Sequence, residues 1–110
     1  MEIRYRDNSG TTRESIERFN KHIDRLGKII SVKGYRYRGR YNAIHEAVMV
    51  KGENGSIRLD GLCWGYCGTG PAGLNTILRA LGVSSLQAEV TSHDVERGYP
   101  KLGTDWILFL

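Results

Sequence analysis

Hydrophobic and polar positions along this chain repeat with two different periods, and each change of period marks a new element. Residues 1–6 alternate apolar and charged side chains, which predicts a short half-buried strand. Apolar residues then recur every three or four positions over 12–26, which predicts a helix. Thr11 is placed to cap its first turn and Gly27 to end it. The stripe consists of Ile16, Phe19, Ile23 and Leu26.

Residues 28–60 have the β-branched content and alternation of strands, with a break expected at Gly34 and a hairpin turn over 52–55. Between Tyr35 and Tyr41 tyrosines alternate with arginines, so a strand would place the two residue types on opposite faces. We expect an amphipathic strand with the tyrosines inward and the arginines in solvent. The alternative is an arginine row that contacts phosphates. The arginines are Arg36, Arg38 and Arg40.

The last third of the chain returns to the helical period. Pro71 suits a first helical turn, and leucine and isoleucine spacing carries a helix to Gly82. Ser84 or Ser85 is placed to cap a further helix toward Arg97, and 106–110 is predicted as a buried terminal strand. The expected fold class is α+β: one domain over residues 1–110, with a mainly antiparallel sheet and two or three helices packed on one face.

Charge is distributed unevenly over the 110 residues, whose formal net charge is +4. Residues 1–58 hold thirteen Lys/Arg against seven Asp/Glu (+6), whereas 59–110 hold three against five (−2). A positive half attracts phosphates or acidic protein surfaces. No apolar run approaches the roughly 20 residues that span a bilayer, and the N-terminus lacks a secretion-signal core. We therefore expect a cytoplasmic protein without a membrane partner.

Cys63 and Cys67 are the only cysteines. Two thiols do not complete a tetrahedral zinc site, so neither a metal nor another cofactor is predicted. One alternative makes Cys67 a nucleophile, activated by the following helix N-terminus, with His45 or His93 as the base. His22 is expected on the exposed side of the first helix.

Residues 61–75 combine five glycines and two large aromatic side chains directly before a helix. Backbone amides near the helix start can hold a phosphate or carboxylate, and the two rings can stack on a base. The alternative is a tight strand-to-helix turn whose rings fill the core and whose Thr69 caps the helix. No Walker motif is present. The predicted ligand-binding residues are Trp64, Tyr66, Gly68, Thr69 and Gly70, with Arg36, Arg38 and Arg40 adding charge.

The stretch Trp64-Gly65-Tyr66-Cys67-Gly68-Thr69-Gly70-Pro71 resembles a family of small phage and bacterial domains of unknown function. That family shares a Trp-Gly-Tyr-Gly-Gly-Ser-Gly-Pro loop before a leucine- and alanine-rich helix, and the likeness covers roughly residues 35–110. Cys67 stands where the family has glycine, and Ala72-Gly73-Leu74 replaces a glutamine-containing helix start. The resemblance implies a phage or mobile-element setting and assigns no reaction.

The sequence therefore predicts a phage-type binding protein that captures a phosphate-bearing small molecule without turnover. A nucleotide or a cyclic nucleotide-like immune signal fits best, which would make the protein an anti-defence sequestering agent in the host cytoplasm. Short strands favour completion of the pocket by a homodimer. The first alternative is an inhibitor that binds nucleic acid or a host defence protein, and the second is a Cys67-dependent enzyme.

Overall fold

Five strands form one sheet in the order β1-β4-β3-β2-β5. A computed structural model describes residues 2–6, 10–65, 68–94 and 102–110 of the chain. β1 pairs with β4 in parallel, and the remaining pairs are antiparallel. The strands and short turns are β1 (Ile3–Arg6), β2 (Ile29–Arg38), η2 (Arg40–Asn42), β3 (Ile44–Gly52), β4 (Gly55–Leu59) and β5 (Gly103–Phe109).

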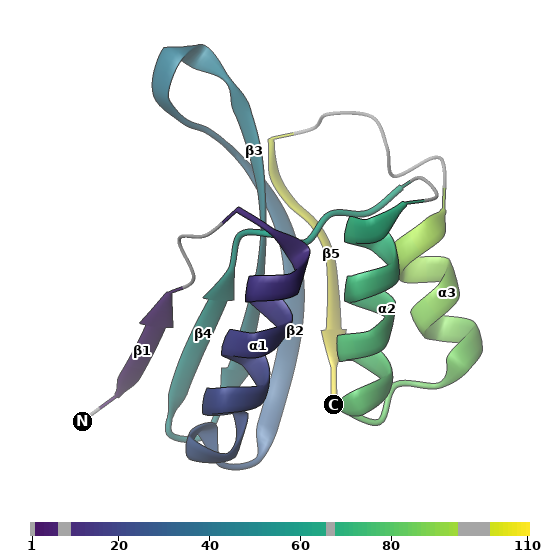
Figure 1. The fold of residues 1–110 in the computed structure, drawn as a ribbon. Helices are drawn as coiled ribbons and strands as arrows, with labels where there is room; N and C mark the ends of the chain where they lie inside the picture. Colours follow the sequence, from purple (N-terminus) through teal and green to yellow (C-terminus); the bar gives the residue numbers. More distant parts are fainter. Residues whose placement is uncertain (1, 7–9, 66–67, 95–101) are drawn as a thin grey trace.

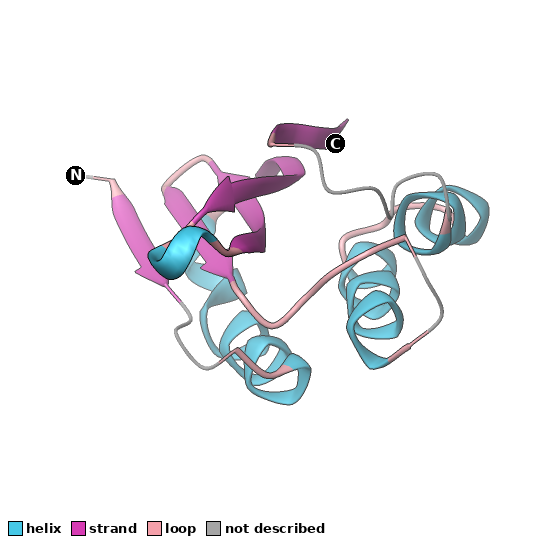
Figure 2. Cartoon of the chain, turned by 90° about the horizontal axis from the view of Figure 1, so that it is seen from above, coloured by secondary structure: helices cyan, strands magenta, loops and turns pink. Residues whose placement is uncertain are grey.

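Among the described residues three α-helices lie on one face of this sheet and leave the other face open (Figures 1 and 2). They are α1 (Thr12–His22), which continues as the 3-10 turn η1 (Ile23–Leu26), α2 (Thr69–Ala80) and α3 (Ser85–His93). The predicted α+β class, with a mainly antiparallel sheet and helices on one face, is confirmed. None of the described helices is long and apolar enough to cross a membrane.

Local signals decide where several elements begin and end. Thr11 Oγ1 accepts a hydrogen bond from the amide of Glu14 (3.3 Å), and Gly27 adopts φ 72° directly after η1, so the helical segment ends where its sequence predicts. Ser84 Oγ accepts from the amide of Gln87 (3.2 Å) and starts α3. The predicted hairpin turn joins β3 to β4. The predicted extension of α3 toward Arg97 lies outside the described residues.

The core fills the space between the helices and the covered face of the sheet. Valine, isoleucine and leucine side chains of three adjacent strands meet apolar side chains of α1, η1 and α2. Removal of this apolar surface from water is the main term that holds the two layers together. The fully buried core side chains include Leu26, Val32, Val48, Val50, Ile57, Leu59, Leu74 and Leu78.

Two strand predictions were wrong. Gly34 does not break a strand, because β2 runs straight through it, and a Cβ there would lie 2.4 Å from the ring of Trp106. β5 is an edge strand and not a buried one: Trp106 is 5% exposed, whereas Ile107 and Phe109 are 43% and 76% exposed. Alternate residues of β5 face the core and the open face, as in any half-covered sheet.

Candidate functional site

The glycine-rich segment is anchored by a cluster of one buried arginine, two partly buried carboxylates and a buried indole. Arg36 is 3% exposed; its Nη2 lies 3.0 Å from Glu46 Oε2 and its Nη1 3.4 Å from Asp105 Oδ2. The same carboxylate oxygen of Asp105 accepts a hydrogen bond from Trp64 Nε1 (2.7 Å). The guanidinium Cζ lies 4.9 Å from the centre of the Trp64 ring. The positive charge of Arg36 is therefore paired with two carboxylates of the protein itself.

A β-bulge in the edge strand makes this cluster possible. Gly34 pairs with Trp106 and the next residue of β2, Tyr35, pairs with Thr104, so Asp105 is the extra residue. A bulge changes the direction in which its side chain is presented. Asp105 is turned toward the covered face, where its carboxylate reaches both Arg36 and Trp64.

This arrangement corrects two expectations. Trp64 is 1% exposed and packs edge-on against Trp106 (ring centres 5.6 Å apart), so its ring is part of the core and is not presented for stacking on a ligand. The orientation of β2 is also the reverse of the expected one at its centre. Arg36 faces the helices, and Tyr35 and Tyr37 face the open side of the sheet. Two internal carboxylates make the buried arginine tolerable.

Glycines of the loop serve the packing of the protein against itself. Gly61 lies against α1, where its amide donates to Ser15 Oγ (2.8 Å) and its carbonyl accepts from Thr12 Oγ1 (2.7 Å). A Cβ at Gly70 would lie 2.0 Å from the sulfur of Cys63, so the loop passes directly under the start of α2. Close approach of protein groups therefore accounts for these two glycines without a ligand.

The start of α2 differs from the alternative interpretation as well. The residue that precedes the helix is Gly68, no described side chain caps the helix, and Thr69 is the first helical residue rather than the cap. Gly68 and Thr69 are exposed, whereas Gly70 is buried, and the Ala72 amide donates to the Gly68 carbonyl (3.1 Å). Tyr66 and Cys67 lie outside the described residues, so the stacking and catalytic roles predicted for them stay predictions.

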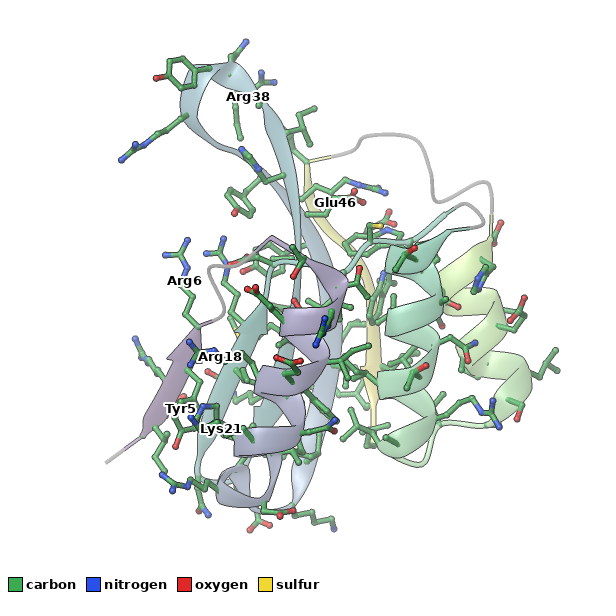
Figure 3. All side chains as sticks on the ribbon, viewed as in Figure 1. Tyr5, Arg6, Arg18, Lys21, Arg38 and Glu46 are labelled. Atoms are coloured by element: carbon green, nitrogen blue, oxygen red, sulfur yellow. The ribbon has the colours of Figure 1, made fainter. Side chains whose placement is uncertain are left out.

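The other two predicted arginines belong to the hairpin between β2 and β3, which projects beyond the helices (Figures 1 and 3). Arg38 and Arg40 are exposed, and Arg38 Nη1 donates to Asn42 Oδ1 (2.7 Å). The structure thus divides the predicted arginine row: Arg36 is internal, and the other two present their charge to solvent.

The histidines do not assemble a catalytic relay in the described part of the chain. His93 Nδ1 lies 2.6 Å from Ser92 Oγ and 3.6 Å from Glu89 Oε2. One ring nitrogen faces both groups, whereas a serine–histidine–carboxylate relay needs both nitrogens. Contrary to expectation, His22 is buried, and its ring stacks on Tyr5 (centres 3.9 Å apart). Within the described ranges no three potential ligands from His, Cys, Asp and Glu gather around a metal position.

The open face of the sheet carries a continuous series of ring and cation contacts. Lys33 Nζ lies 5.5 Å from the centre of the Tyr35 ring, and the Tyr35 and Tyr37 rings are 6.0 Å apart. Tyr37 stacks on His45 (5.6 Å), and Arg58 Cζ lies 4.7 Å from the Tyr37 ring. The guanidinium of Arg58 also donates to the Tyr37 hydroxyl and to Asp60 Oδ1 (2.9 Å). Burial raises the pKa of the Tyr35 phenol, which therefore carries no negative charge near neutral pH.

Beside these rings the open face has a shallow hollow of about 500 Å³. Its apolar lining includes Ile30, Met49, and Ile107 and Phe109 of the edge strand, and cationic side chains surround it. Neither Lys33 nor Lys51 forms an ion pair with a described carboxylate. Among the described lining residues the cationic ones are Arg4, Lys33 and Lys51, and the acidic one is Glu2, which lies 3.6 Å from Arg4 Nη2.

The sequence alone does not mark this surface as a site. The alternation of Tyr35 and Tyr37 with arginines signalled a two-faced strand, but it did not say which face the helices cover. Lys51 and Met49 carry no motif of their own and become neighbours of Lys33 only through strand pairing. The signal that was available is the +6 charge of residues 1–58, which supply four of the five strands.

Comparison of the chain with protein-family models, with curated proteins and with solved structures gives no significant match. The resemblance to the phage and bacterial domains therefore stays a prediction from the sequence.

Proposed function

We propose that the chain binds single-stranded nucleic acid across the open face of its sheet. The observation that carries the proposal is the row of rings on β2 and β3 beside lysines that lack an acidic partner among the described residues. Aromatic side chains on an uncovered sheet stack on unpaired bases, and lysine and arginine contact the phosphates between them. Tyr35 and Tyr37 supply stacking surface, and Lys33 and Lys51 supply the charge.

The composition of the hollow favours a strand of nucleotides over an acidic protein. Its apolar floor of Met49, Ile107 and Phe109 suits the faces of bases, and its cationic margin lies within the same surface. Every nucleotide combines a base, whose faces are apolar, with a charged phosphate. An acidic protein segment need not combine apolar and charged groups in this way. The binding needs no chemical step.

The competing proposal is the capture of a nucleotide or cyclic nucleotide-like immune signal by the glycine-rich loop, as an anti-defence activity in an infected cell. It is favoured by the uncapped start of α2 and by an adjacent groove of about 450 Å³ lined by Thr12, Arg13, Thr69 and Thr76. It is weakened by the burial of Trp64, which removes one of the two rings it requires.

The test measures the binding of fluorescein-labelled single strands of DNA and RNA, each 15 nucleotides long. Fluorescence anisotropy gives the binding constant at salt concentrations between 50 and 200 mM. We expect the logarithm of the binding constant to fall linearly with the logarithm of salt concentration, with a slope of about −0.7 for each phosphate neutralised. Lys33→Gln combined with Lys51→Gln should weaken binding and make the slope shallower by about 0.7 per lysine.

Arg13→Gln combined with Arg79→Gln is the matched control, because it also removes two positive charges, but on the helical side. Both side chains are exposed, and Arg13 lines the groove beside α2. Unchanged affinity in this variant supports the open face. A loss with the control, but not with the lysine variant, would favour the loop instead. An absence of binding to either strand at 50 mM salt would overturn the proposal.

A further inference from the structure

The tip of the β2–β3 hairpin carries an exposed ring in a backbone conformation that is unfavourable for it. Tyr41 is 98% exposed, with φ 58° and ψ 26°, and Asn42 follows with φ 64°. Two consecutive left-handed residues, closed by a hydrogen bond from the Ala43 amide to the Arg40 carbonyl (3.2 Å), define a type I′ turn. We infer that Tyr41 is a base-stacking residue, held out by this turn for the nucleic-acid strand of the proposed function.

The turn chemistry indicates that Tyr41 does not serve the fold. Type I′ turns favour asparagine or glycine at both central positions, because other side chains meet the following carbonyl in the left-handed region. Asn42 follows this preference and Tyr41 does not. A bulky residue that opposes its own backbone and is almost fully in solvent gains nothing from packing. A backbone outlier of this kind is a reason to look for function.

The hairpin holds the tyrosine on a well-defined base. The Gly39 amide donates to the Ala43 carbonyl (2.8 Å), and Arg38 Nη1 donates to the Asn42 side chain (2.7 Å). The ring of His45 lies so close to Gly39 that a Cβ there would be 2.3 Å from it. A ring presented on an ordered turn costs little conformational entropy on binding.

Charge and position identify the partner. Arg38 and Arg40 flank the tip, and the hydrogen-bond partner of Arg38 is a neutral amide, so the tip is cationic. His45, which packs against the turn, also stacks on Tyr37 of the open face. The hairpin therefore extends the proposed binding surface beyond the sheet (Figure 3). A strand on the open face continues along the hairpin, where Tyr41 stacks on one base and the two arginines contact adjacent phosphates.

The experiment uses single-stranded 15-mers that carry 2-aminopurine at one position each, because stacking quenches its fluorescence. The wild-type protein should quench a subset of positions. Tyr41→Asn keeps the turn and removes the ring, so it should abolish quenching at one end of that subset and weaken binding by about 5- to 150-fold, the range for one lost base stack. Tyr41→Trp should retain both properties. Thermal unfolding of Tyr41→Asn should occur at the wild-type temperature or above it.

The outcomes separate this inference from the proposed function on which it rests. If the wild-type protein binds no 15-mer, both fail. If it binds and Tyr41→Asn binds equally well with the same quenching pattern, only the role of Tyr41 is overturned. If Tyr41→Trp loses as much affinity as Tyr41→Asn, the ring is not what the strand contacts, and the inference is again overturned.

Discussion

The two faces of β2 use the same kinds of side chain for opposite purposes. On the covered face Arg36 lies beside Trp64, and Glu46 and Asp105 neutralise it. On the open face Lys33 lies beside Tyr35 without a described acidic partner. An arginine or lysine next to an aromatic ring is thus no sign of function by itself. What matters is whether carboxylates lie next to the cation. Where they do, its charge is neutralised within the fold, and where they do not, it can interact with a ligand.

The largest effect is expected on the covered face. Arg36→Ala would leave Glu46 and Asp105 partly buried without their cation, and loss of one partner from a buried ion pair costs about 3–5 kcal/mol. Urea denaturation should show this loss of unfolding free energy. Arg38→Ala, two residues along the same strand, is the matched control and should change stability by about 0.5 kcal/mol or less. If the two substitutions lower the free energy of unfolding equally, the covered and open positions of β2 do not differ in this way.

The open face should give the opposite pattern. Tyr35→Ser removes a ring that lies beside Lys33 and Tyr37 on the open face, so it should weaken single-strand binding by about 1–3 kcal/mol. Its circular-dichroism spectrum should match that of the wild type. Ser31→Ala is the control, because it changes a side chain on the same strand and face without removing a ring. A variant that binds normally but unfolds readily would assign Tyr35 to the fold.

The smallest effect concerns the contact between β1 and α1, where Tyr5 stacks on His22 near Arg18 and Lys21 (Figure 3). Burial lowers the pKa of His22 below its usual 6.5, and Lys21, Arg18 and Arg25 lower it further. As the pH falls, His22 therefore takes up a proton in the unfolded chain at a higher pH than it does in the folded protein. The stability from neutral His22 is complete above about pH 6.5 and falls as the pH drops toward the lowered value.

Melting temperatures at pH 7.5 and pH 5 measure this term. His22→Phe keeps a ring against Tyr5 and removes the titration, so the difference between the two pH values should be smaller in the variant than in the wild type. The same difference in both proteins would show that His22 does not contribute to the pH dependence.

The parts of the fold that follow from neighbouring residues were predictable from the sequence. The helical segment over 12–26 was correct because Thr11 and Gly27 act within one turn of its ends. The turn between β3 and β4 was also predicted correctly, because the residues that form it are neighbours in the sequence. The orientation of β2 was not, because it depends on Asp105, which lies 69 positions from Arg36 and reaches it only through a bulge.

The candidate site shows the same limit. Arg38 and Arg40 were predicted as ligand contacts. Both are exposed because they lie in the hairpin, which the local alternation of side chains favours. The burial of Trp64 depends on Trp106 and Asp105, both far along the chain. The hollow on the open face brings together residues of all five described strands, and no local pattern marks such a surface.

The central claim is that the open face of the sheet, and not the glycine-rich loop, holds the ligand. The most direct test is the backbone amide NMR spectrum of the labelled protein during titration with an unlabelled 15-nucleotide single strand. We predict shifts concentrated at Lys33, Tyr35, Met49 and Lys51 and at the hairpin tip, with α1 and α2 unchanged. Shifts confined to Gly68, Thr69 and Gly70, with the sheet unchanged, would contradict it.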